Sequence, residues 1–134
     1  MIVLDTHILL WWIGLSDRLS SGAKAAIEVE RGKGSKGRIL VSSISVWEVA
    51  MLVNNGRLTL SMDVDSWLHI ASGIEGVQFL PLDSRVAIEA TRLPGEFHKD
   101  PADRMIVAQA RVLSAPLVTV DEKILAYQHV KTIG

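Results

Sequence analysis

The feature that most constrains this chain is the alternation of short apolar segments with longer amphipathic ones. Between the apolar segments, hydrophobic residues recur at helical spacing, as in Val64, Trp67, Leu68 and Ala71. Short apolar strands separated by helices are typical of a parallel sheet that is covered on both faces. We therefore predict an α/β fold with a central, mostly parallel sheet of four to five strands. The expected strands are residues 2–4, 39–41, 77–80, 116–119 and a terminal edge strand at 130–133.

Helices are expected in the intervals between these strands. Their predicted ranges are 6–13, 21–30, 46–54, 63–72, 84–93 and 102–113, followed by a short helix that Asp121 opens. Residues 31–38 are rich in glycine and basic residues and contain no acid, which predicts a flexible loop. We see no internal repeat and no long linker, so residues 1–134 form one domain.

Composition restricts the classes of function. The chain has no cysteine, which excludes disulfides and thiolate metal sites and fits a reducing compartment, so we expect a cytoplasmic protein. Asp5 interrupts the N-terminal apolar run, and no uncharged apolar stretch approaches the roughly 18 residues of a membrane span. The net charge of −1 gives no overall attraction to nucleic acid. Nucleic-acid binding would need a local basic patch or cations held by acidic residues.

Acidic residues stand where strands end and helices begin. In an open parallel sheet, functional sites form beyond the carboxyl ends of the strands, so acids that are distant in sequence can meet there. Asp5 carries the most weight, because it ends the strand expected at the centre of the sheet. The other acids at such junctions are Glu48, Asp83, Asp100, Asp103 and Asp121.

Each acid also has a purely structural interpretation. Ser45 and Glu48 have the spacing of a capping box, and Asp100 followed by Pro101 is typical of a helix N-cap. Asp83 and Asp121 are equally plausible caps, and Asp103 would interact with a helix dipole. Together, however, a cysteine-free cluster of carboxylates favours Mg²⁺ or Mn²⁺, ions that serve phosphoryl chemistry. The residues alone do not decide which three or four acids bind.

Four motifs, in order, resemble those of a known family. They are residues 2–7 (IVLDTH), 45–50 (SVWEVA), 98–108 (HKDPADRMIVA) and 117–121 (LVTVD). Their order and spacing are similar to those of PIN-domain nucleases, in particular the VapC toxins of bacterial type II toxin–antitoxin systems. The resemblance covers essentially the whole chain. It implies a PIN-like three-layer α/β/α fold.

The resemblance also implies a site and an activity. It selects Asp5, Glu48, Asp103 and Asp121 as an acidic quartet that holds Mg²⁺ or Mn²⁺, and it sets Asp83 aside. Thr6, Thr119 and Asp100 would hold the residues of the quartet in place without binding the metal themselves. The implied activity is hydrolysis of RNA phosphodiesters to 5′-phosphate and 3′-hydroxyl ends, which inhibits translation and growth. A VapB-like antitoxin would neutralise it, and the toxin would be a homodimer. Val120 stands where many relatives carry Arg or Lys.

Six basic or histidine side chains are candidates for contacts with RNA, each with a structural alternative. Arg104 could equally form a surface ion pair, and His98 could position a loop. The basic residues of 31–38 could belong to a solvated connector. The candidates are Arg104, His98, Lys99, Lys33, Lys36 and Arg38.

Two further alternatives concern the surface and the function. Trp11 and Trp12 are adjacent on a predicted helix and cannot both point into one core, which predicts that one lies at an interface. Besides a nuclease, the acids at strand ends are compatible with a receiver-like regulatory module or with a non-catalytic PIN domain that acts by binding. The sequence does not identify the RNA, the cut site or the antitoxin.

Overall fold

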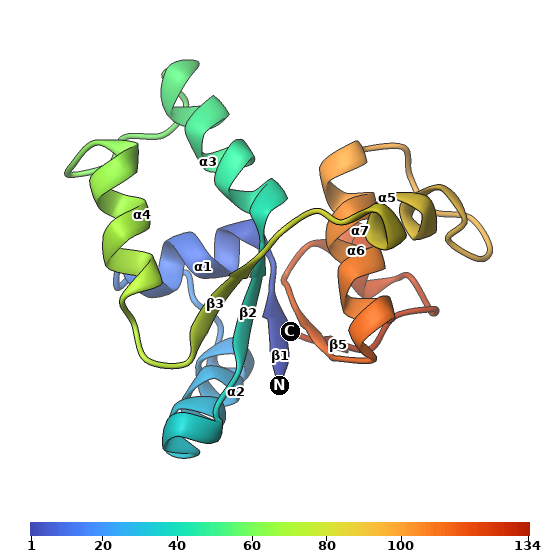
Figure 1. The fold of residues 1–134 in the computed structure, drawn as a ribbon, viewed down its shortest axis with the longest axis horizontal. Helices are drawn as coiled ribbons and strands as arrows, with labels where there is room; N and C mark the ends of the chain where they lie inside the picture. Colours follow the sequence, from blue (N-terminus) through green and yellow to red (C-terminus); the bar gives the residue numbers. More distant parts are fainter.

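The alternating segments form a five-stranded sheet in the computed structural model, which describes residues 1–134. The strands are β1 (Ile2–Leu4), β2 (Ile39–Ser42), β3 (Val77–Leu80), β4 (Leu117–Val118) and β5 (Thr132–Ile133). Their order is β3-β2-β1-β4-β5, and every neighbouring pair is parallel (Figure 1). The predicted sheet is confirmed, with β1 at its centre and the C-terminal strand at one edge.

The strand order decides between two α/β alternatives. Flavodoxin-like domains, the class to which receiver modules belong, have the order 2-1-3-4-5, in which the first strand lies one place from an edge. Here β1 lies between β2 and β4, and β3 is the edge strand. The receiver-like alternative is therefore wrong.

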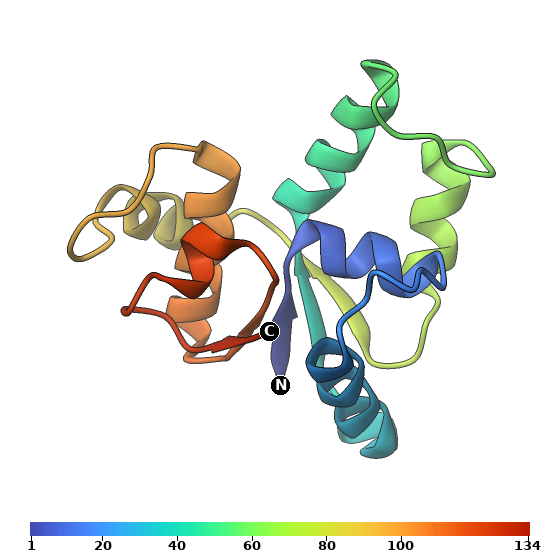
Figure 2. The same cartoon turned by 180° about the vertical axis from the view of Figure 1, so that it is seen from behind.

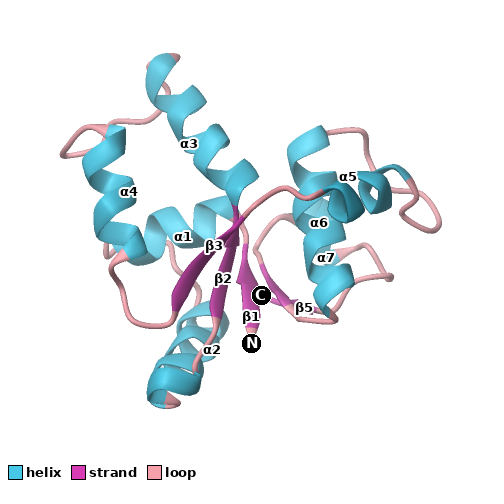
Figure 3. Ribbon diagram, viewed as in Figure 1, coloured by secondary structure: helices cyan, strands magenta, loops and turns pink.

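Alternation of side chains along the strands builds two cores. Ile2 and Leu4 of β1 belong to one hydrophobic cluster and Val3 to the other, as expected for a strand buried on both faces. Helices α1 (Thr6–Ile13), α2 (Ser21–Gly32), α3 (Ser43–Asn54) and α4 (Val64–Ser72) contribute to the first cluster. Helices α5 (Ser84–Thr91), α6 (Pro101–Leu113) and α7 (Glu122–Leu125) contribute to the second. Figures 2 and 3 show these two helical groups on opposite sides of the sheet. No helix is both long enough and apolar enough to cross a membrane.

Helix α3 begins three residues earlier than predicted. Ser42, the last residue of β2, is its N-cap, and the Ser42 hydroxyl accepts a hydrogen bond from the Ile44 N–H at 3.2 Å. Ser45 is therefore inside the helix, and Glu48 lies beyond its first turn. The capping-box interpretation of this pair is wrong, which leaves the Glu48 carboxylate free for another role.

The basic segment 31–38 is not the flexible loop that its composition predicts. Helix α2 continues to Gly32, and a short 3₁₀ helix, η1 (Gly34–Lys36), follows. The reason is the buried carboxylate of Glu30, which accepts hydrogen bonds from Lys33 Nζ at 2.7 Å, from the Arg38 N–H at 3.0 Å and from the terminal amine of Met1. Burial alone would raise the pKa of Glu30, but these donors outweigh it and hold the pKa at about 2.

The central strand should dominate stability. Leu4 of β1 is fully buried, whereas Leu15, in the turn after α1, is 92% exposed. We expect Leu4→Ala to lower the free energy of unfolding by about 2–5 kcal/mol, because it removes buried methyl groups and leaves a cavity. Leu15→Ala, the matched control, should leave the urea midpoint almost unchanged. Equal midpoints for the two variants would contradict this account of the core.

Candidate active site at the carboxyl edge of the sheet

A cavity of about 470 Å³ lies at the carboxyl edge of the sheet. The elements that reach it are the loops and helix starts that follow β1, β2 and β4, together with the start of α6. It is lined by five carboxylates, those of Asp5, Glu48, Asp100, Asp103 and Asp121. Asp83 does not line the cavity, because it caps α5 after the edge strand β3.

Asp5 is held by both of its oxygens. It follows β1 directly, is only 8% exposed, and caps α1 by accepting a hydrogen bond from the Thr6 N–H at Oδ1, 2.8 Å away. Its Oδ2 accepts a hydrogen bond from Thr119 Oγ1 at 2.7 Å. The same Thr119 oxygen accepts from the Asp121 N–H at 3.0 Å. One buried hydroxyl thus joins the acid that follows β1 to the acid that follows β4.

Asp121 caps the helix that it opens. Its Oδ1 accepts hydrogen bonds from the N–H groups of Lys123 at 2.8 Å and Ile124 at 3.2 Å. Its Oδ2 accepts none from the protein. The interpretation of Asp121 as a cap is therefore correct, and it does not exclude a role as a ligand.

Glu48 is oriented by two hydroxyls. Thr6 Oγ1 lies 2.6 Å from Glu48 Oε1 and 2.8 Å from Ser45 Oγ. Since one hydroxyl has one proton, Thr6 donates to the carboxylate and accepts from Ser45. Sequence reasoning missed this role for Ser45, because the only available signal was its spacing to Glu48, which indicated a cap.

Asp103 lies among several negative charges at the start of a helix. It stands in the first turn of α6, where its N–H donates to the N-cap carboxylate of Asp100 at 2.9 Å. Burial, and then the negative charges of Asp5, Asp100, Asp121 and Glu48, raise the pKa of Asp103 to about 7. Burial also raises the pKa values of Asp5 and Glu48. His98 Nε2 lies 2.9 Å from Asp103 Oδ2 but lacks the geometry of a hydrogen bond, which leaves that nitrogen without a partner.

The cluster fits a hard divalent cation in its donor chemistry. Its donors are carboxylate oxygens, the ligands that Mg²⁺ and Mn²⁺ prefer, and a cation would offset the charge that raises these pKa values. No three acidic or histidine side chains are yet close enough together to hold a metal ion. Binding would therefore require the carboxylates to move closer together.

Comparison with known proteins identifies the fold family. The model of the PIN domain matches residues 2–130. The chain belongs to the PIN-domain family. It is 34% identical over 132 residues to Ribonuclease VapC22 of Mycobacterium tuberculosis. The aligned region covers 98% of this chain and 95% of that protein.

Solved structures share the fold at lower sequence identity. One is VapBC2 from Rickettsia felis bound to a DNA fragment from the promoter, with a TM-score of 0.71, 19% identity, and coverage of 98% of this chain and 97% of that chain. Another is a toxin–antitoxin complex from Klebsiella pneumoniae, with a TM-score of 0.66, 17% identity, and coverage of 100% and 97%. The PIN-like three-layer fold is thus confirmed.

The basic residues that line the acidic cavity are not those that the sequence analysis selected. Lys33, Lys36 and Arg38 precede β2 and lie at the amino edge of the sheet, opposite the acids (Figure 1). They do not line the acidic cavity, and their expected role in guiding RNA stays a prediction. Two residues that sequence reasoning had not selected for RNA, His7 and Arg18, line the acidic cavity instead. Arg18 belongs to no recognisable motif and lies in the turn between α1 and α2.

Arg104 has a structural task that the sequence analysis did not predict. Its Nε donates to the Ala90 carbonyl at 2.8 Å, and its Nη1 donates to the carbonyls of Phe97 at 3.0 Å and His98 at 3.2 Å. The guanidinium therefore fastens the loop before α6 to the end of α5, and it forms no ion pair. Lys99 is exposed on that loop, next to Asp100.

The pKa of Asp103 predicts how stability depends on pH when no metal is present. The unfolded chain loses the Asp103 proton near pH 4, whereas the folded protein keeps it up to about pH 7. The folded state thus binds more protons between these values, so its stability falls as the pH rises through this range. We expect the melting temperature in EDTA to fall from pH 5 to pH 8, and Asp103→Asn to reduce this fall.

Asp83→Asn is the matched control, because Asp83 caps α5 outside the cluster. It should retain the pH dependence of the unaltered protein. Adding Mg²⁺ or Mn²⁺ at pH 8 should raise the melting temperature of the unaltered protein more than that of Asp103→Asn. The same pH dependence in Asp103→Asn and the unaltered protein would contradict the assignment.

Proposed function

We propose that this PIN domain is a metal-dependent endoribonuclease toxin that hydrolyses RNA phosphodiester bonds. The observation that carries the proposal is the crowding of carboxylates around one partly buried cavity, where burial and then the neighbouring negative charges raise the pKa of Asp103 to about 7. Like charges held this close in a partly buried site favour a cation as the missing partner. The similarity to Ribonuclease VapC22 supports RNA as the substrate.

Asp5, Asp103 and Asp121, with Glu48, would hold Mg²⁺ or Mn²⁺. Such an ion polarises a phosphoryl oxygen and makes bound water more acidic. The protein's own contribution is to orient the ligands: Thr119 fixes Asp5 Oδ2 and the backbone of Asp121, so that Asp121 Oδ2 remains available. Asp100 supports Asp103 by capping the helix on which it stands.

Glu48 is the best-placed group to handle the proton of the attacking water. Thr6 holds Oε1, and no hydrogen bond within the protein uses Oε2. Its pKa is raised by burial and then by the nearby charges of Asp5 and Asp100, which brings it closer to the range that suits a general base. Attack of water on the phosphorus would break the P–O3′ bond, and the departing 3′-oxygen would take up a proton, which leaves a 5′-phosphate and a 3′-hydroxyl.

An apolar groove supports regulation by a VapB-like antitoxin. A cavity of about 430 Å³ between α1, α3 and α4 is lined by Trp11, Trp67, Leu52 and Met62, among others. Amphipathic segments dock in grooves of this kind. We propose that the antitoxin occupies it, that the toxin is a cytoplasmic homodimer, and that release of the antitoxin permits RNA cleavage that inhibits translation and growth. Trp47, which is 56% exposed, is suited to such an interface. Trp11 and Trp12 are partly buried, and both pack against the first core.

Asp5→Asn tests the catalytic assignment. Asparagine preserves the shape of the side chain and can still hydrogen-bond to Thr6 and Thr119, so the fold should survive. Loss of one charged ligand should lower the rate of RNA cleavage by more than about a hundredfold. Cleavage is measured by mapping new 5′ ends in cellular RNA after induction, and with purified protein in Mn²⁺.

Two controls accompany this measurement. Asp83→Asn should cleave RNA like the unaltered protein, because Asp83 lies outside the cavity. EDTA should abolish cleavage by the unaltered protein, and Mn²⁺ in excess should restore it. Full metal-dependent cleavage by Asp5→Asn would refute the assignment of Asp5, and cleavage that survives EDTA would refute the metal.

A further inference from the structure

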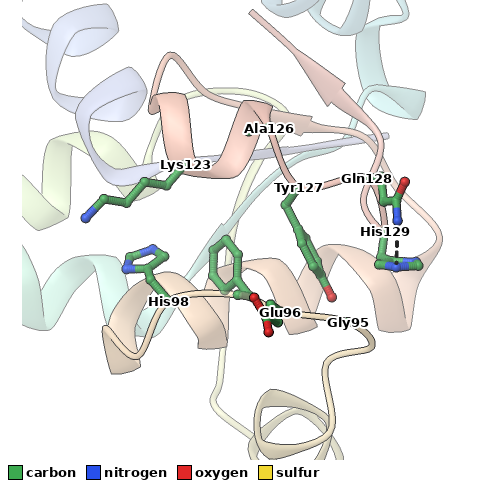
Figure 4. Close-up of a pocket in the computed structure, with 9 residues that line it drawn as sticks. Gly95, Glu96, His98, Lys123, Ala126, Tyr127, Gln128 and His129 are labelled. Atoms are coloured by element: carbon green, nitrogen blue, oxygen red, sulfur yellow. Dashed lines mark hydrogen bonds between the residues drawn. The ribbon is translucent and has the colours of Figure 1, made fainter.

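A second cavity, of about 480 Å³, lies beside the acidic one and has a different chemistry. It lies between the loop before α6 and the segment that follows α7 (Figure 4). Its lining includes Glu96, Phe97, His98, Lys123, Tyr127 and His129. None of the acidic quartet lines it, and its volume is within the range of about 300–1,000 Å³ that is typical of sites for small ligands.

We call this second cavity the ring pocket, because aromatic rings form a continuous row along it. The centroids of Phe97 and His98 are 4.5 Å apart, those of Phe97 and Tyr127 are 4.8 Å apart, and those of Tyr127 and His129 are 5.4 Å apart. Tyr127 is buried and its hydroxyl donates to the Pro94 carbonyl, which fixes its ring between those of Phe97 and His129. Phe97, His98 and His129 are only partly buried, so parts of their rings remain available to a ligand.

Backbone conformation and hydrogen bonds to the backbone position the row of rings. Gly95 has a φ of +66°, a left-handed conformation that favours glycine, and a Cβ there would lie 3.2 Å from His129 Nε2. Arg104 holds the carbonyls of Phe97 and His98. The hydrogen bond from the Tyr127 hydroxyl to the Pro94 carbonyl joins this loop to the segment after α7 and so connects the two walls of the ring pocket.

The ring pocket is continuous with the acidic site at one end. His98 faces the ring pocket with its ring and lies 2.9 Å from Asp103 Oδ2 through Nε2. Lys123 is two residues after Asp121 and donates its N–H to that carboxylate. Figure 4 shows Lys123 and His98 at the same end of the ring pocket, with Gln128 and His129 at the other. A cation thus stands on the side nearest the acids.

We propose that the ring pocket binds a nucleobase of the RNA, next to the phosphate that the acidic site cleaves. The partly exposed rings would contact the face of the base, a mode that accepts every base and contributes strongly to binding of single-stranded RNA. Lys123 would contact the phosphate between this base and the acidic site. Glu96, exposed at the rim, can accept hydrogen bonds from the N–H groups of a base edge. This inference rests on the proposed function.

The chain offers its own reporters for this site. Tyr127 is the only tyrosine, and Phe97 is one of two phenylalanines, the other being Phe79 in the opposite core. We would label tyrosine and phenylalanine rings with ¹³C and titrate the Mg²⁺-loaded protein with the four 5′-ribonucleoside monophosphates. The resonances of Tyr127 and Phe97 should shift and that of Phe79 should not. Ribose 5-phosphate, which lacks a base, should leave all three nearly unchanged.

Two variants test the assigned contacts. Phe97→Leu should weaken nucleotide binding by about tenfold, the effect expected for loss of one base–aromatic contact. Lys123→Gln, an exposed substitution that does not threaten the fold, should reduce the affinity for nucleoside monophosphates to that for the nucleosides. Lys131→Gln, an exposed cation away from both cavities, is the matched control and should bind like the unaltered protein.

The outcomes separate this inference from the proposed function. If the unaltered protein cleaves RNA but nucleotides do not shift Tyr127 and Phe97, or shift them no more than ribose 5-phosphate does, the ring pocket is not a base site. If nucleotides shift these rings and the Lys123→Gln effect appears, yet no RNA is cleaved with Mg²⁺ or Mn²⁺, the base site stands and the nuclease assignment fails.

Discussion

The hydrogen bonds of one buried hydroxyl hold the acidic edge of the sheet together. Thr119 Oγ1 donates to Asp5 Oδ2 and accepts from the Asp121 N–H, so it fixes the ends of two neighbouring strands, β1 and β4, relative to each other. Thr6 does the same for β1 and α3 through Glu48 and Ser45. Neutral hydroxyls are suited to this task, because they orient carboxylates without neutralising them. A lysine or arginine in either place would offset the negative charge of the cluster.

That negative charge has a structural consequence. Parallel strands with β1 at the centre bring acids from distant segments to one edge, where burial and mutual repulsion raise their pKa values. Several basic residues do not compensate for this charge, because Lys33 and the N-terminal amine contact Glu30 at the opposite edge and Arg104 donates to carbonyls. Arg18 and His7 are the basic side chains that line the acidic cavity. The sheet and its two cores therefore have to hold the acids together against their mutual repulsion.

Much of this could be predicted from the sequence, and the failures have physical reasons. The strands and the acids at their ends follow from the alternation of apolar and amphipathic segments, and the residues of the quartet follow from the family resemblance. Glu48 was open to interpretation as a cap only because the start of α3 was placed at Val46, whereas Ser42 caps it. Segment 31–38 is structured because it contacts the buried Glu30. Such tertiary contacts cannot be predicted from the local composition.

The ring pocket illustrates a different limit. Its rings come from a loop before α6 and a segment after α7, and neither segment has a periodic pattern or a motif that marks it. Such sites depend on two irregular backbones meeting, which Gly95 and Arg104 arrange here through a left-handed turn and hydrogen bonds to carbonyls. Acids at strand ends can be shared across a whole fold family, whereas loops vary between its members. The proposed base site therefore lies on segments that can differ between members of the family, whereas the proposed metal site lies on acids that the fold itself brings together.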